Sequence, residues 1–110
     1  MLVHLHAATF GAQLHTSFRV LRSSTPTVEV ELVEVTERNE NDGKQPWATA
    51  RQERFSILFR GDHDPALQQG MYHLLHDELG DLELFLVPAG RDRNGVYYEA
   101  VFNRLRPADA

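Results

Sequence analysis

Residues 81–104, DLELFLVPAGRDRNGVYYEAVFNR, read as two strands joined by a glycine-containing turn. Side chains alternate along an extended strand, so Leu84 lies on one face while Phe85 lies on the other. A strand that is apolar on both faces is usually covered on both, which predicts a place in the middle of a β core. Gly90 and Asn94-Gly95 suit a tight reversal. The stretch therefore predicts a β-hairpin with strands over 82–88 and 96–104.

Other segments of the chain alternate in the same way. Residues 27–37, TVEVELVEVTE, place apolar residues on one face and glutamates on the other. At Leu32 and Val33 two apolar residues are adjacent and the pattern shifts by one. One unpaired residue would restore the inward face, so we predict a β-bulge or a sharp twist there. This alternation predicts three further strands, over 16–22, 27–36 and 54–60.

Two stretches interrupt the strand pattern. Near the N-terminus, Thr9 is a candidate cap for a short helical turn that carries Phe10 and Leu14. Residues 38–53 are polar and rich in turn-forming residues. We expect a long loop over 38–53, and long loops often carry function.

Residues 64–80, DPALQQGMYHLLHDELG, fit either a helix or a strand. The Asp-Pro at the start and the glycine at the end are typical helix start and stop signals. Against a helix, Gly70 in its interior costs roughly 1 kcal/mol relative to alanine. The residues after Gly70 also alternate as in a strand. We predict a strand over 70–76 and a hairpin turn after it, with a helix as the alternative.

Composition narrows the classes of function. The chain has 110 residues, no cysteine and a formal net charge of −5, from 16 acidic and 11 basic residues. This length suits one domain, and the acidic balance opposes the phosphate neutralisation on which nucleic-acid binding depends. No apolar run reaches the roughly 18 residues of a membrane span, and the first residues lack the pattern of a secretory signal peptide. We expect no nucleic acid, no membrane span and a location in the cytoplasm or in a larger particle.

From Phe10 to Asn103 the sequence resembles a bacterial family of small domains that is known only as a domain of unknown function. The resemblance implies a small all-β domain, and genes of the family tend to lie near phage-tail-like or fibre-related genes. Relatives often carry a proline in the segment that matches 77–80, which favours the hairpin. The resemblance implies no activity, cofactor or catalytic residue. It is carried by Phe55-Ser56, Phe59-Arg60-Gly61, Gln69-Gly70, Tyr72, His76, Leu79-Gly80, Phe85-Leu86-Val87-Pro88 and Tyr98-Glu99-Ala100-Val101-Phe102-Asn103.

Histidines are the candidate metal ligands. His4 and His6 are two residues apart, so on a strand both rings would lie on one face, as two zinc ligands do. A wet strand face is the commoner explanation of such spacing. His76-Asp77-Glu78 has the residue types of an acid–base pair, but adjacent turn residues point apart and a polar turn is the favoured interpretation. There is no phosphate loop and no nucleophile elbow, so we assign no catalytic residue.

Four residues are candidates for contact with a partner. Trp47 is the large apolar residue of the 38–53 loop and would either cover the core or anchor a partner. Arg60 would either bind a partner's carboxylate or form an internal ion pair with Glu99, which we favour. Tyr72 and Tyr97 are candidates for an aromatic surface patch.

The sequence thus predicts one all-β domain over 1–110, with 1–8 and 106–110 flexible. We expect a small antiparallel barrel or sandwich of about six strands with one short N-terminal helix. We predict a non-enzymatic protein-interaction or assembly module without a cofactor, which binds a protein partner or its own copies. The alternative is a small-molecule or metal-binding β-barrel that uses histidines. The predicted core comprises Phe18, Val30, Leu32, Phe55, Ile57, Phe59, Leu84, Leu86, Ala100 and Phe102.

Overall fold

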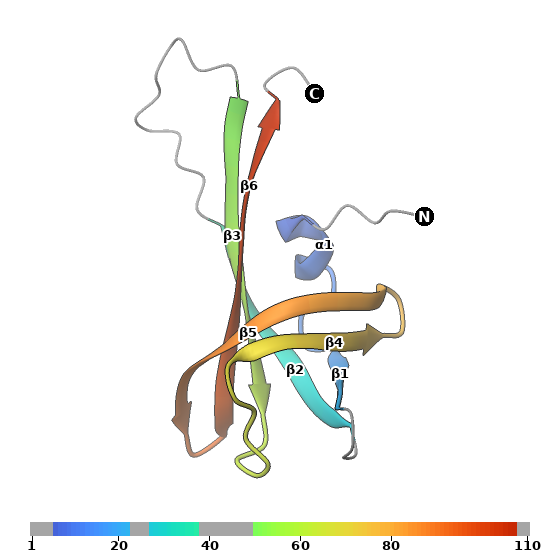
Figure 1. Ribbon diagram of the computed structural model, residues 1–110, viewed down its shortest axis with the longest axis vertical. Coiled ribbons are helices and arrows are strands. Elements are labelled where there is room, and N and C mark those ends of the chain that lie inside the picture. The colour runs from blue at the N-terminus through green and yellow to red at the C-terminus, as the bar shows by residue number, and fades with distance from the viewer. Residues whose placement is uncertain (1–5, 23–26, 38–49, 108–110) are drawn as a thin grey trace.

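The computed structural model describes residues 6–22, 27–37 and 50–107, which form a short helix and six strands (Figure 1). All six predicted strands are present, and the ambiguous segment after Gly70 is a strand. In chain order the elements are α1 (Ala7–Gly11), β1 (Ser17–Leu21), β2 (Val28–Glu37), β3 (Ala50–Gly61), β4 (Gly70–His76), β5 (Gly80–Asp92) and β6 (Gly95–Pro107).

The six strands close into an antiparallel barrel. Their order is β1–β2–β3–β6–β5–β4, and β4 pairs back onto β1. The two alternatives predicted from the sequence are thereby resolved in favour of the barrel. Among the described residues, no helix combines the length and the hydropathy that crossing a membrane requires.

Strands β3 and β6 continue beyond their other neighbours as a two-stranded ribbon (Figure 1). The last pair between β2 and β3 is Glu37–Phe55, and β5 pairs with β6 only as far as Val87–Glu99. The β3–β6 pairing runs on to Ala50–Pro107. The strand predicted from residue 54 therefore begins earlier, because backbone pairing continues where the apolar alternation has ended. The predicted loop is shorter by the same amount, and its residues 38–49 lie outside the described ones.

A β-bulge interrupts β2 at the predicted position. Leu32 pairs with Phe59, but the next pair is Glu34 with Leu58, so Val33 has no partner across the ladder. The extra residue restores the alternation, and Val35 packs against the core. A single inserted residue thus keeps both halves of β2 facing inward.

The outer face of β5 corrects one expectation. Leu84 and Leu86 are buried as predicted, but Phe85 on the opposite face is 45% exposed. A closed barrel covers only the inner face of each strand, so apolar residues on the outer face stay in contact with solvent. Strand β5 has a neighbouring strand on each side, β6 and β4, but only its inner face is covered.

The barrel interior is filled by side chains. Nine of the ten predicted core residues are buried, and Phe102 is partly buried and packs on the others. Its ring stacks on Phe55 with the centroids 4.5 Å apart. Missing from the sequence prediction were Ala7, Phe10, Val20, Leu67, Leu74, Leu82, Val96 and Tyr98, all of which are buried.

Helix α1 packs against the core beside β2 and β3. Phe10 is fully buried, and its ring lies 5.5 Å from that of Phe102. The predicted cap is wrong by three residues: His6 is the N-cap, and the Thr9 hydroxyl accepts a hydrogen bond from the His6 N–H at 3.2 Å. A helix of five residues is marginal alone, so the buried ring holds it in place.

The hairpin between β5 and β6 depends on Gly95. This residue pairs with Asp92 across a two-residue turn and has a φ of +152°. A β-carbon at Gly95 would lie 2.2 Å from the carbonyl oxygen of Gly61, so only glycine fits. Gly90, predicted in the turn, instead lies in β5 at a second register shift.

Candidate functional site

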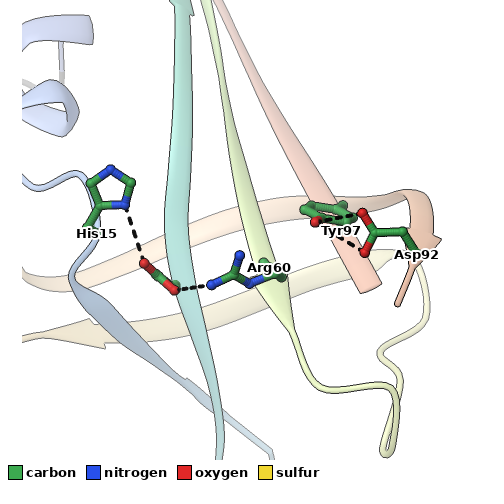
Figure 2. A network of polar contacts seen from close by, with 5 residues as sticks. His15, Arg60, Asp92 and Tyr97 are labelled. Carbon is green, nitrogen blue, oxygen red and sulfur yellow. Dashed lines mark hydrogen bonds and ion pairs between the residues drawn. The ribbon is translucent and has the colours of Figure 1, made fainter. Parts of the chain in front are cut away.

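An ion-paired network lies on the outer face of β2 and β3 (Figure 2). Glu31 and Arg60 are direct cross-strand partners, and an Arg60 Nη donates to the Glu31 carboxylate at 2.5 Å. The other carboxylate oxygen of Glu31 lies 3.4 Å from His15 Nδ1. The predicted pair of Arg60 with Glu99 is therefore wrong. In the ladder Glu99 pairs with Leu58, whereas Glu31 stands directly beside the guanidinium.

Tyr97 is held within its own hairpin. Its hydroxyl lies 3.0 and 3.3 Å from the two carboxylate oxygens of Asp92, and the Asn94 N–H donates to Asp92 Oδ1 at 2.8 Å (Figure 2). The Asn94 backbone donor, followed by the Tyr97 hydroxyl, lowers the pKa of the Asp92 carboxyl below its ordinary value. The phenol supports the β5–β6 turn, which accounts for its position without a partner.

A polar cavity of about 420 Å³ adjoins the Arg60 ion pair. Three of its lining side chains are carboxylates, and the single guanidinium is already bonded to one of them. It opens on the outside of the barrel, since Glu31 and Arg60 face outward. The lining residues are Ser17, Glu29, Val30, Glu31, Arg60, Gly61, Asp62 and Asn94.

The three predicted contact residues that lie within the described ranges do not form one patch. Arg60 and Tyr97 are cross-strand partners in the β3–β6 ladder. Tyr72 lies on β4, which β5 separates from β6 in the sheet order, and its hydroxyl donates to the Gln68 carbonyl at 2.6 Å. Trp47 lies outside the described residues.

Only one of the two histidines predicted as metal ligands lies among the described residues. His6 begins α1 as its N-cap, and His4 lies outside the described residues. Within the described ranges, no group of three or more histidine, cysteine, aspartate or glutamate residues is placed to hold a metal ion.

His76 has a structural role that the sequence did not reveal. The residue is 5% exposed, and its ring lies 4.3 Å from the Phe18 ring. Its Nδ1 accepts hydrogen bonds from the backbone N–H groups of Glu78 and Leu79, at 3.0 and 3.1 Å. Nε2 therefore carries the proton and donates to Thr16 Oγ1 at 2.9 Å. Both ring nitrogens are occupied in fastening the β4–β5 turn to the start of β1.

The open β6 edge is the feature with most capacity to bind another chain. We use this name for Ala100–Phe102, three residues of β6 that follow its last pair with β5. Among the described residues, these three have a strand neighbour only on the β3 side. Val101, on the outer face, is 67% exposed. An unpaired row of backbone donors and acceptors beside an exposed apolar residue is a template for strand pairing.

Comparison with known proteins places the chain in a family. Residues 5–102 match the family model described as a domain of unknown function, DUF6916. The chain belongs to the DUF6916 family. No curated protein and no solved structure matches it. The family assignment agrees with the resemblance found in the sequence, and it brings no activity with it.

Within this DUF6916 domain, several motif residues of the resemblance have structural roles. His76 fastens a turn, Gly61 leaves room for the Val30 side chain, and the Tyr98 hydroxyl accepts the Leu67 N–H at 2.8 Å. The open β6 edge has no such local signal, because alternation identifies a strand but not its neighbours. Only the register of the β5–β6 pairing reveals it.

Proposed function

We propose that this protein is a non-enzymatic protein-interaction or assembly module that accepts an extended strand at the open β6 edge. The observation that carries the proposal is the end of the β5–β6 pairing at Val87–Glu99, while β6 itself runs to Pro107. Strand addition to such an edge uses main-chain hydrogen bonds for affinity and side-chain contacts for specificity.

Three features support this proposal over the alternatives. The ribbon of β3 and β6 extends away from β4 and β5 (Figure 1), and Val101 on β6 is 67% exposed. Core side chains occupy the barrel interior, so the described residues offer no support for a barrel that holds a ligand inside. From the resemblance noted in the sequence, we further propose that the module belongs to a phage-tail-like or fibre-related bacterial assembly.

The test is a nuclear magnetic resonance titration of the labelled protein with a model strand. The probe is a peptide of about six alternating threonine and valine residues, a common strand length. We expect saturable shifts at the amides of Ala100–Phe102. Val101→Lys should weaken them, because lysine on an edge disfavours pairing. The matched control is Met71→Lys, at an equally exposed apolar residue on β4.

Two further outcomes bear on the proposal. Shifts of the same amides with protein concentration alone, together with growth in mass by light scattering, would identify a second copy as the strand donor. The proposal fails if neither peptide nor protein concentration moves the amides of the open β6 edge.

A further inference from the structure

Glu99 is a charged side chain among apolar neighbours on the outer face of the barrel. It lies between its ladder partners Leu58 on β3 and Val87 on β5, and all three residues are partly buried. Val101 follows two residues later on the same face of β6 and is 67% exposed. Apolar neighbours keep part of the water away from the carboxylate, so a positive charge beside it would be attracted more strongly than at an open surface.

No cation among the described residues neutralises Glu99. Its carboxylate makes no hydrogen bond or ion pair with them, and its oxygens are open to solvent. The diagonal neighbours of Glu99 on β3 are Ser56 and Arg60, and the Arg60 guanidinium is bonded to Glu31. The charge of Glu99 is therefore available to a partner.

The open β6 edge begins at the residue after Glu99. A strand added there would place one residue directly opposite Val101, and that residue would be a diagonal neighbour of Glu99. Diagonal neighbours across a ladder lie about 7–8 Å apart, which is within reach of a long side chain. An arginine or lysine at this position would lay its aliphatic stem on Val101 and extend its charged end to the Glu99 carboxylate.

We propose that the strand accepted at the open β6 edge carries an arginine or lysine opposite Val101, and that Glu99 selects it by forming an ion pair. This inference rests on the proposed function and names the chemistry of its partner. Backbone pairing provides affinity for any extended chain, and Glu99 adds discrimination in favour of a basic residue. The formal net charge of −5 attracts the same class of partner at longer range.

The experiment compares three peptides on the wild-type protein by the same titration. The first is the threonine–valine peptide, and in the other two a central threonine is replaced by arginine or by glutamate. The arginine peptide should bind about fivefold more tightly than the threonine peptide, as a favourable cross-strand pair of opposite charges provides. This advantage should shrink at high salt, and the glutamate peptide should bind most weakly.

Variants separate an ion pair with Glu99 from the general attraction of an acidic protein. Glu99→Gln should bind the arginine and threonine peptides equally, and Glu99→Lys should prefer the glutamate peptide. The matched control is Glu29→Gln, which removes the same charge from an exposed glutamate on β2. The ladders place Glu29 level with the start of β6, away from Val101. This control should keep the fivefold preference for arginine.

A measurement on the wild-type protein gives the same answer without a variant that might fail to fold. The side-chain carboxyl carbon of Glu99 should shift on titration with the arginine peptide and stay in place with the threonine peptide. A carboxyl resonance that the arginine peptide leaves unmoved would overturn the ion pair.

The outcomes separate this inference from the proposed function. If all three peptides shift the amides of Ala100–Phe102 with equal affinity, the edge binds strands and the basic preference is wrong. If Glu99→Gln keeps the preference for arginine, or Glu29→Gln abolishes it, net charge is responsible and the role of Glu99 is wrong. If no peptide shifts these amides, both the inference and the proposed function fail.

Discussion

Replacing His76 should destabilise the protein more than its single side chain suggests. In His76→Leu the ring's contact with Phe18 is largely kept, but three hydrogen bonds are lost. Loss of the hydrogen bond to Thr16 costs about 1 kcal/mol. Each of the two turn N–H groups left without an acceptor costs about 1 kcal/mol more. This is the lower limit for a buried donor, and it applies because the turn is partly solvated. The free energy of unfolding should fall by about 3 kcal/mol, out of a total of roughly 5–15 kcal/mol for such a domain.

Urea denaturation followed by circular dichroism measures this change. His76→Asn separates the contributions, since an asparagine oxygen can take the place of Nδ1 and accept the two turn N–H groups. It should lose about 1–2 kcal/mol. The control is His73→Leu, whose ring is 41% exposed beside Asp81 and whose loss should cost less than about 1 kcal/mol. A His76→Leu protein as stable as the control would refute the turn-fastening role.

The remaining predictions concern the core and the β5–β6 hairpin. Phe59→Ala, at a fully buried position, should lower the free energy of unfolding by about 3–5 kcal/mol, and an unchanged urea midpoint would remove Phe59 from the core. Gly95→Ala should lower the thermal midpoint, because its β-carbon would overlap a carbonyl oxygen of β3; a midpoint equal to that of the wild type would contradict the close approach. The Asp92 carboxyl should titrate below its ordinary value of 3.8 in a carbon-detected titration, since Asn94 and then Tyr97 donate to its charged form. The associated stability is present above that value and is lost as the pH falls through the lowered pKa. Tyr97→Phe should move the titration back towards 3.8, and an unmoved titration would contradict the contact.

Local alternation was sufficient to predict where the strands lie. The bulge at Val33 followed from two adjacent apolar residues, because a shift of one residue would otherwise turn the rest of β2 outward. The segment after Gly70 required more, since helix signals and alternation conflicted there. Pairing with β5 and β1 settles it as a strand, which is a tertiary effect on a locally ambiguous sequence.

The candidate site was much less predictable, because it depends on which strands are neighbours. Arg60 was predicted to pair with Glu99 because the charge of Glu99 interrupts an apolar strand, but the actual register places Glu31 beside Arg60 instead. The open β6 edge was not visible at all, since it depends on where the pairing of β5 with β6 ends. Residue types can be read from a sequence, but cross-strand distances cannot.

The position of β3 between β2 and β6 has a consequence for synthesis on the ribosome. Phe55 and Phe59 lie on β3, which pairs with β2 and with β6. Strand β6 is synthesised last among the described strands. Until β6 emerges, the apolar face of β3 cannot be enclosed, and closure of the ring must wait for contacts of long sequence separation. The nascent chain therefore presents its future interior to solvent for most of its translation, and it should depend on holding chaperones until the last strand arrives.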